Sequence, residues 1–182
     1  MKRILMVFLG LLSGGPGCND GPSGASYPVT GITAKERLAD VEALAQSMCA
    51  SAKLMSVRGK DIATDGTAQE WRYMFIDTET PGPTYWFHAT SGTVEFDSTA
   101  PVMPGPAVIS HAWFDSDVAL DLAEVKGGAA FRSQKGEWTI EASLGEPVVP
   151  NSTTYWWIGY RSSDGGTLWL TLDAAAAPIV VW

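Results

Sequence analysis

Four carboxylates lie within ten positions in the stretch WFDSDVALDLAE, residues 113–124: Asp115, Asp117, Asp121 and Glu124. Paired carboxylates perform acid–base chemistry when a cleft with apolar surroundings drives their pKa values apart. The same residue types also form the solvated face of an ordinary helix. Here the spacing favours the helix, because Asp115 or Ser116 suits an N-cap and acidic residues suit a first turn.

The apolar residues of this stretch indicate how such a helix would lie. Val118, Leu122 and Val125 form one stripe, which Ala119 and Ala123 widen. We expect this stripe to face a sheet, with Asp117 and Asp121 in solvent. We expect Gly127-Gly128 to end the helix. The carboxylates are therefore interpreted as a cap and a polar face, and the sequence predicts no catalytic residues.

Other catalytic or metal-binding patterns are absent from the sequence. The two histidines, His88 and His111, have no Cys or His partner at a spacing typical of zinc ligands. No G-x-S-x-G motif marks a nucleophilic serine. We predict no metal site and no cofactor, and we predict that the protein is not an enzyme.

The first residues have the pattern of a secretory signal peptide. Lys2 and Arg3 precede the apolar run Ile4–Leu12, which is about half the ~20 residues that a membrane-spanning helix needs. The segment LLSGGPGC then resembles a bacterial lipobox that ends at Cys18. We therefore predict a signal peptide at 1–17, a lipid anchor such as palmitate on Cys18, and a location in the bacterial cell envelope, facing the periplasm or the cell surface. The alternative is plain cleavage, with Cys18 in a linker.

The amino-acid composition and net charge argue against some classes of binding partner. The chain has 182 residues, 46% of them apolar, and a net charge of −8. A negative protein lacks the basic surface that nucleic acid or anionic lipid requires. We expect no nucleic-acid binding, membrane contact only through the lipid anchor, and a monomer.

The rest of the chain predicts an α+β fold. Residues 18–31 are rich in Gly, Ser and Pro, and we expect them to form a flexible tether. Thr33 and Glu36 match a capping box before a helix whose apolar stripe is Leu38, Val41, Ala45 and Met48. Strand signals follow in WRYMFID, TYWFHAT and TVEF, and again in EWTIEASL, TTYWWIGYR, TLWLTLD and PIVVW. We predict two helix–antiparallel-sheet repeats, at 32–98 and 109–182, joined by a Pro-rich connector at 99–108, with the helices on one face of the sheet.

A helix followed by W-x-Y-x-F at residues 71–75, and then by a hairpin that ends near SG or LDA, resembles a PepSY-like domain. The tandem arrangement is similar to the β-lactamase-inhibitor-protein-like architecture. This resemblance covers residues 32–182 and implies a non-enzymatic envelope domain, sometimes inhibitory, with no catalytic motif.

Eight tryptophans in 182 residues supply the remaining functional signal. Alternation places Trp86 and His88 on one face of their strand, and Trp169 on the face opposite Leu168, Leu170 and Leu172. The leucine-rich face should meet the helices, which leaves Trp86, His88 and Trp169 on a second face. We expect this face to bind a protein or peptide partner in the envelope, as an inhibitor or accessory subunit. The alternatives are packing of these tryptophans against loops, an envelope hydrolase, or a sugar- or lipid-binding module.

Overall fold

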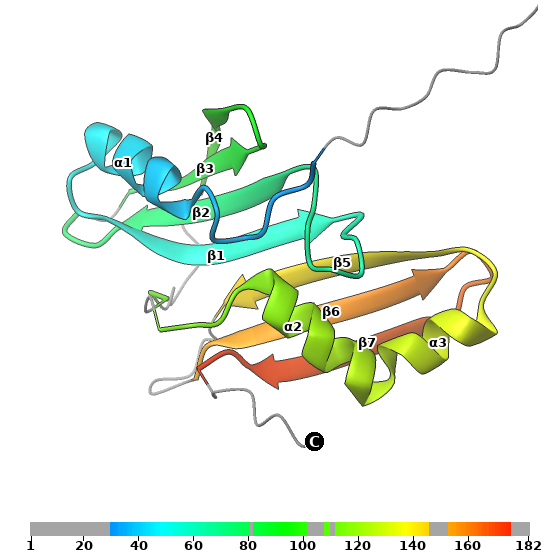
Figure 1. Cartoon of the computed structure of the whole chain (residues 1–182). Coiled ribbons are helices and arrows are strands. Elements are labelled where there is room, and N and C mark those ends of the chain that lie inside the picture. The colour runs from blue at the N-terminus through cyan, green and yellow to red at the C-terminus, as the bar shows by residue number, and fades with distance from the viewer. Residues whose placement is uncertain (1–29, 81, 102–107, 110–111, 146–152, 176–182) are drawn as a thin grey trace, which may run out of the picture.

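The computed structural model describes residues 30–80, 82–101, 108–109, 112–145 and 153–175 (Figure 1). The predicted signal peptide, Cys18, His111 and the PIVVW segment lie outside these residues. The elements, in chain order, are α1 (Leu38–Met48), β1 (Ala52–Lys60), β2 (Trp71–Asp77), β3 (Thr84–Ala89), β4 (Val94–Ala100), α2 (Ser116–Ala123), the wider turn η1 (Glu124–Gly128), α3 (Ala129–Gln134), β5 (Trp138–Gly145), β6 (Tyr155–Ser162) and β7 (Thr167–Asp173).

The strands form one continuous antiparallel sheet of seven, in the order β4-β3-β2-β1-β5-β6-β7. The prediction of two helix–antiparallel-sheet repeats is therefore wrong. β1 and β5 pair in the middle of the sheet, from Val57 opposite Leu144 to Lys60 opposite Glu141. This pairing joins all seven strands, so the chain builds one sheet with short helices against it.

The central strand β1 is the element that sequence patterning missed. Its pairing with β2 shifts register between Leu54 and Ser56, which marks a β-bulge. Residues on both of its faces are buried: Leu54 and Val57 in the main core, and Met55 in a second cluster. A bulge and burial on both faces remove the strict alternation that identifies a half-buried strand.

Both helical segments lie on one face of this sheet, as Figure 1 shows. From α1, the residues Leu38, Val41 and Ala45 enter the main core, whereas Met48 at the end of the predicted stripe is 47% exposed. Trp71, Tyr73 and Phe75 of β2 meet them from the sheet, each no more than 1% exposed. The alternation in WRYMFID therefore predicted the core face of β2 correctly.

The second helical segment is rotated relative to its prediction. The buried residues of α2 are Ser116, Ala119, Leu120 and Ala123, whereas Val125 is 88% exposed. A face of small residues allows the helix to approach the sheet closely, and the larger Val118 and Leu122 flank it, half-buried. Of the predicted stripe, Ala119 and Ala123 are buried as expected and Val118 and Leu122 are half-buried, whereas the prediction is wrong at Val125.

The predicted helix stop at Gly127-Gly128 is also wrong, because the helix continues as α3 after a kink. Gly127 has a φ of 129°, which an L side chain rarely adopts. A Cβ at Gly128 would lie 2.3 Å from the phenol oxygen of Tyr160. The glycines therefore let the helix bend over β6 rather than end. Among the described helices, none is long and apolar enough to cross a membrane.

Candidate functional site: the helix-free face of the sheet

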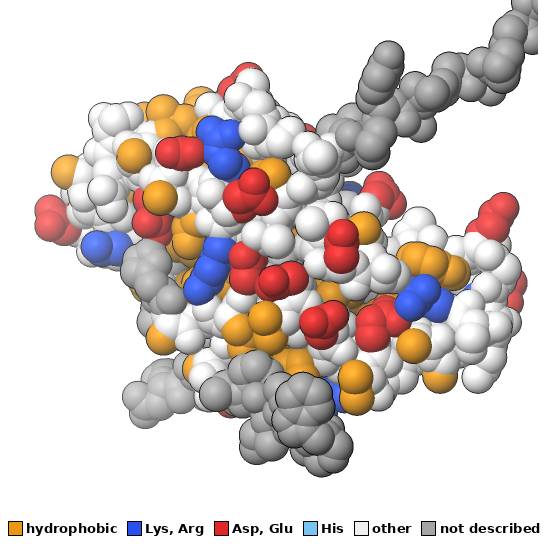
Figure 2. All heavy atoms as spheres, viewed as in Figure 1, with side chains coloured by type: hydrophobic (Ala, Val, Ile, Leu, Met, Phe, Trp, Pro, Cys, Tyr) orange, Lys and Arg blue, Asp and Glu red, His pale blue; other side chains and the backbone are white. Residues whose placement is uncertain are grey.

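The four carboxylates of residues 113–124 have separate structural environments. Asp115 is the N-cap of α2, as the sequence predicted, and accepts a hydrogen bond of 2.7 Å from the Ser116 N–H. It also accepts from the Thr33 hydroxyl at 2.6 Å and from the Lys35 N–H at 3.0 Å. Asp117 and Asp121 are exposed. Figure 2 shows acidic side chains gathered over α2 on the helix-covered side of the molecule.

Glu124 belongs to a different cluster, at the helix kink. Its carboxylate pairs with the Arg132 guanidinium and accepts a 2.9 Å hydrogen bond from the Tyr160 hydroxyl. Burial, followed by the hydrogen bond to Glu124, raises the pKa of Tyr160 above its ordinary value. The phenol therefore stays protonated and ties the kink to β6. Because these carboxylates do not converge on one cleft, they provide no acid–base pair.

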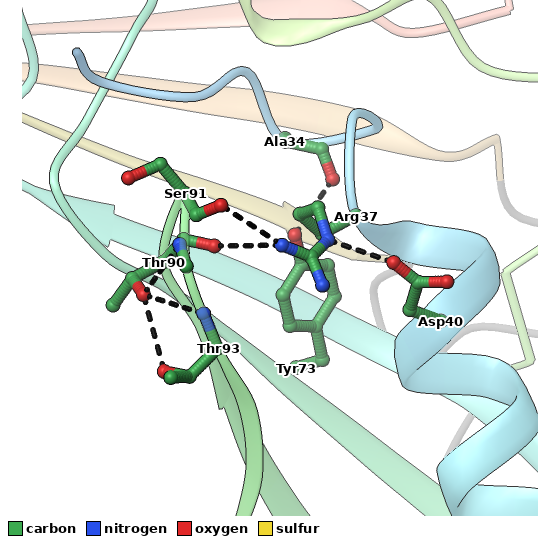
Figure 3. Close-up of polar contacts among 8 residues, drawn as sticks. Ala34, Arg37, Asp40, Tyr73, Thr90, Ser91 and Thr93 are labelled. Carbon is green, nitrogen blue, oxygen red and sulfur yellow. Dashed lines mark hydrogen bonds and ion pairs between the residues drawn. The ribbon is translucent and has the colours of Figure 1, made fainter.

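A second polar cluster fixes the start of α1 to the turn between β3 and β4 (Figure 3). The Arg37 guanidinium donates to the Ser91 carbonyl at 3.0 Å and pairs with Asp40 at 2.7 Å. Beneath it, the buried Tyr73 hydroxyl donates to the Ala34 carbonyl at 2.9 Å. Burial raises the pKa of this phenol above its ordinary value. These contacts join α1 to the sheet, and we interpret the cluster as structural.

Within the described ranges, no three His, Cys, Asp or Glu side chains gather as a metal site would require. Cys49, directly after α1, is half-buried, with its sulfur 3.4 Å from the Ser51 hydroxyl.

The sheet surface opposite α1 and α2 is here called the helix-free face. Trp86, His88 and Trp169 all lie on it, since their neighbours Phe87, Ala89 and Leu172 belong to the core on the other side. Antiparallel sheets tolerate one uncovered face. The structure therefore places all three residues on one surface, although at different positions along it.

Trp86 and His88 lie at the β4 side of this face. Trp86 packs against a small cluster of Met55, Met74 and Ile76, and the Arg58 guanidinium lies 5.3 Å from its ring centroid. His88 is 3.5 Å from the Glu95 carboxylate. The Trp86 ring is therefore held between apolar side chains and a cation.

Trp169 lies at the other edge, on β7, and is 52% exposed. Its six-membered ring covers Gly159 of β6, because a Cβ there would lie 2.6 Å from it. The Arg161 guanidinium is 5.4 Å from its ring centroid. Trp157 and Tyr155 lie on the same face of β6, with ring centroids 6.2 Å apart, and both are half-buried. Tyr155, Trp157 and Trp169 are here called the aromatic patch.

Tyr155 and Trp157 were not among the predicted site residues. Alternation within TTYWWIGYR could have identified them, because Trp156 lies in the core and its two neighbours therefore lie on the opposite face of the strand.

The predicted site residues do not form one site. Five strand spacings separate β3 from β7 in the sheet order. At ~4.8 Å per strand, Trp86 and Trp169 are roughly 24 Å apart. Trp169 instead joins the aromatic patch, and Trp86 joins Arg58.

The sequence matches no protein-family model, no curated protein and no solved structure.

Proposed function

We propose that the protein binds a protein or peptide partner non-covalently through the helix-free face, and that it acts by binding rather than by catalysis. The observation that carries this proposal is the aromatic patch, in which Trp169 is about half exposed and the half-buried Trp157 and Tyr155 lie close together on the neighbouring strand. Exposed aromatic groups on soluble proteins mark interaction sites. Tyr, Trp and Arg are the residues that most often dominate binding energy at protein interfaces.

The local packing of the patch supports this role. Arg161 lies over Trp169 and also pairs with Glu141 of β5 at 2.7 Å. Gly159 leaves room for the Trp169 ring to lie flat on the sheet. The aromatic surface is therefore pre-ordered, which lowers the entropy lost when a partner binds.

We also propose that the protein works in the bacterial envelope as a lipoprotein anchored through Cys18, and as a monomer. The support comes from the sequence, in the signal-like residues 1–17 followed by Cys18. The resemblance to PepSY-like domains fits such a location and stays a prediction.

Photo-cross-linking tests the binding face. A photo-reactive phenylalanine replaces Thr171, which is exposed and pairs with Trp157, in the full chain expressed in its own bacterium. The matched control replaces Ala130, which is exposed on α3. We expect a protein adduct from position 171 and none from position 130, and we expect Trp169→Ala to abolish it. Absence of an adduct at 171, or equal adducts at both positions, would contradict the proposal.

A further inference from the structure

A pocket of about 770 Å³ opens on the helix-free face at the β1–β4 side. Its volume is in the range of sites that accept small ligands or a few side chains. Strands β1 to β4 and the segment between β1 and β2 supply its lining: Arg58, Gly59, Lys60, Asp61, Gln69, Glu70, Arg72, Trp86, Asp97 and Ser98. This lining includes three basic side chains, Arg58, Lys60 and Arg72, and three acidic ones, Asp61, Glu70 and Asp97.

The basic residues are arranged in a row across neighbouring strands. Arg58 of β1 is directly opposite Arg72 of β2, and Arg72 is directly opposite His88 of β3. Like charges directly opposite in an antiparallel pair destabilise the sheet. Arg72 is compensated, since it pairs with Asp97 and lies 3.7 Å from Glu70.

Arg58 and Lys60 are not compensated in the same way. Within the part of the chain that the structure describes, neither forms an ion pair with a carboxylate. Glu141, the cross-strand neighbour of Lys60, is bound instead to Arg161 at 2.7 Å. Among the ion pairs of the described residues, none joins Asp61, the remaining acidic residue of the lining, to either cation. Two exposed cations therefore face the pocket from one strand.

Trp86 fixes one of these cations. The Arg58 guanidinium lies over its ring at 5.3 Å, and Met55, Met74 and Ile76 pack against the ring. A guanidinium held on an aromatic face loses less side-chain entropy when it forms a bidentate pair with a carboxylate. Trp86 thus acts as a positioning residue for Arg58 rather than as a contact surface.

We propose that Arg58 and Lys60 bind a carboxylate side chain of an acidic peptide segment that the partner presents to this pocket. This inference rests on the proposed function, because the pocket and the aromatic patch share the helix-free face. Charge complementarity selects an acidic segment, since a carboxylate would supply the counter-charge that Arg58 and Lys60 lack. The net charge of −8 repels long polyanions, so a short segment fits best.

Fluorescence anisotropy with a short labelled peptide of alternating glutamate and glycine tests this assignment on the full chain. We expect Arg58→Gln and Lys60→Gln each to weaken binding about tenfold, the usual effect of losing a charged hydrogen-bond partner. The matched control is Lys53→Gln, on the same face of β1 but outside the pocket lining, which should bind normally. Trp86→Phe should retain binding and Trp86→Leu should lose it, although both variants melt at similar temperatures.

Three results would overturn the assignment: equal binding of a glutamine–glycine peptide, an equal loss in Lys53→Gln, or displacement of the acidic peptide by inorganic phosphate at equal carboxylate and phosphate concentrations. The last result would indicate a general anion site. A photo-adduct at position 171 that survives Arg58→Gln with Lys60→Gln would refute this inference and leave the proposed function standing. No adduct at position 171 in any variant refutes the proposed function itself.

Discussion

Replacement of Asp115 by alanine should destabilise the fold far more than replacement of Asp121, six residues further along the chain. Asp115 accepts three hydrogen bonds of 3.0 Å or shorter, from the Thr33 hydroxyl, the Lys35 N–H and the Ser116 N–H, at 2.6, 3.0 and 2.7 Å. Two of them join segments that are 82 and 80 positions apart in the chain. Asp121 is exposed, and its side chain forms no such bond within the described residues.

The expected loss of unfolding free energy follows from these contacts of Asp115. A hydrogen bond to a charged group contributes about 1.5–3 kcal/mol, and loss of an N-cap costs about 0.5–2 kcal/mol. The contributions overlap, because one carboxylate makes all three bonds and water can replace part of it at this half-buried site. We expect Asp115→Ala to lower the free energy of unfolding by about 3 kcal/mol, and Asp121→Ala by less than about 0.5 kcal/mol.

Urea unfolding followed by tryptophan fluorescence measures both changes. With a slope of about 1–3 kcal/mol per molar urea, the midpoint of Asp115→Ala should fall by about 1–3 M at unchanged slope. A double-mutant cycle with Thr33→Val isolates the longest-range bond. A change below about 1 kcal/mol, or an equal loss in Asp121→Ala, would refute the view that Asp115 joins the N-terminal segment to α2.

Four further outcomes are expected. In thermal melts, Trp156→Ala should cost about 3–5 kcal/mol because this ring is fully buried, whereas Trp169→Ala should cost less than about 1 kcal/mol. Gly128→Ala should cost about 1–3 kcal/mol, because its Cβ would overlap a phenol oxygen on β6. The pKa of Tyr73 is raised in the folded state, so the contribution of this phenol to stability is complete below the unfolded tyrosine pKa of about 10 and is lost as the pH rises above it. The urea midpoint of the wild-type protein should therefore fall more steeply in alkali than the midpoint of Tyr73→Phe. Mass spectrometry of the membrane fraction should find an acylated Cys18, and an unmodified Cys18 would contradict the anchor.

Much of the sheet could be predicted because local alternation determines which strand residues are buried. Trp71, Tyr73 and Phe75 alternate strictly and are all buried, and the same rule predicted the core face of β7. The central strand could not be predicted in this way, since its bulge and its two buried faces leave no period of two. Without β1, the other six strands looked like two separate groups, and the fold class was wrong for that reason.

The predicted orientation of α2 was wrong for a different reason. A pattern of apolar residues treats Ala119 and Val118 alike, but packing does not. The buried face of α2 consists of Ser116, Ala119, Leu120 and Ala123, which leaves Val118 and Leu122 at its sides. Gly127-Gly128 was misread in the same way, because the sequence does not show that Tyr160 lies against the kink.

The candidate site was partly predictable. Alternation assigned Trp86 and Trp169 to one face, since that depends only on neighbouring residues in each strand. Their separation depends on the strand order of the whole sheet, which local sequence does not contain. The contact between Arg58 and Trp86 could not be predicted from local sequence either, because it depends on β1 lying two strands from β3 in the sheet.

The two faces of the sheet carry different types of side chain, and this difference bears on the proposed binding role of the helix-free face. The helix-covered face is filled by aliphatic residues and aromatic rings, among them Trp71, whose indole N–H donates to the Ile32 carbonyl. On the helix-free face, lysine or glutamate in place of the aromatic residues would keep the sheet soluble with less exposed apolar area. Instead, the Trp169 ring lies over Gly159 beneath Arg161, and the Trp86 ring lies beneath Arg58. Each ring is partnered by a cation that solubility alone would not require at that position. Cations also lie over Trp113 and Trp138, which belong to or pack against the main core, so the proposed recognition of a partner rests on the exposure of the Trp169 ring on the uncovered face.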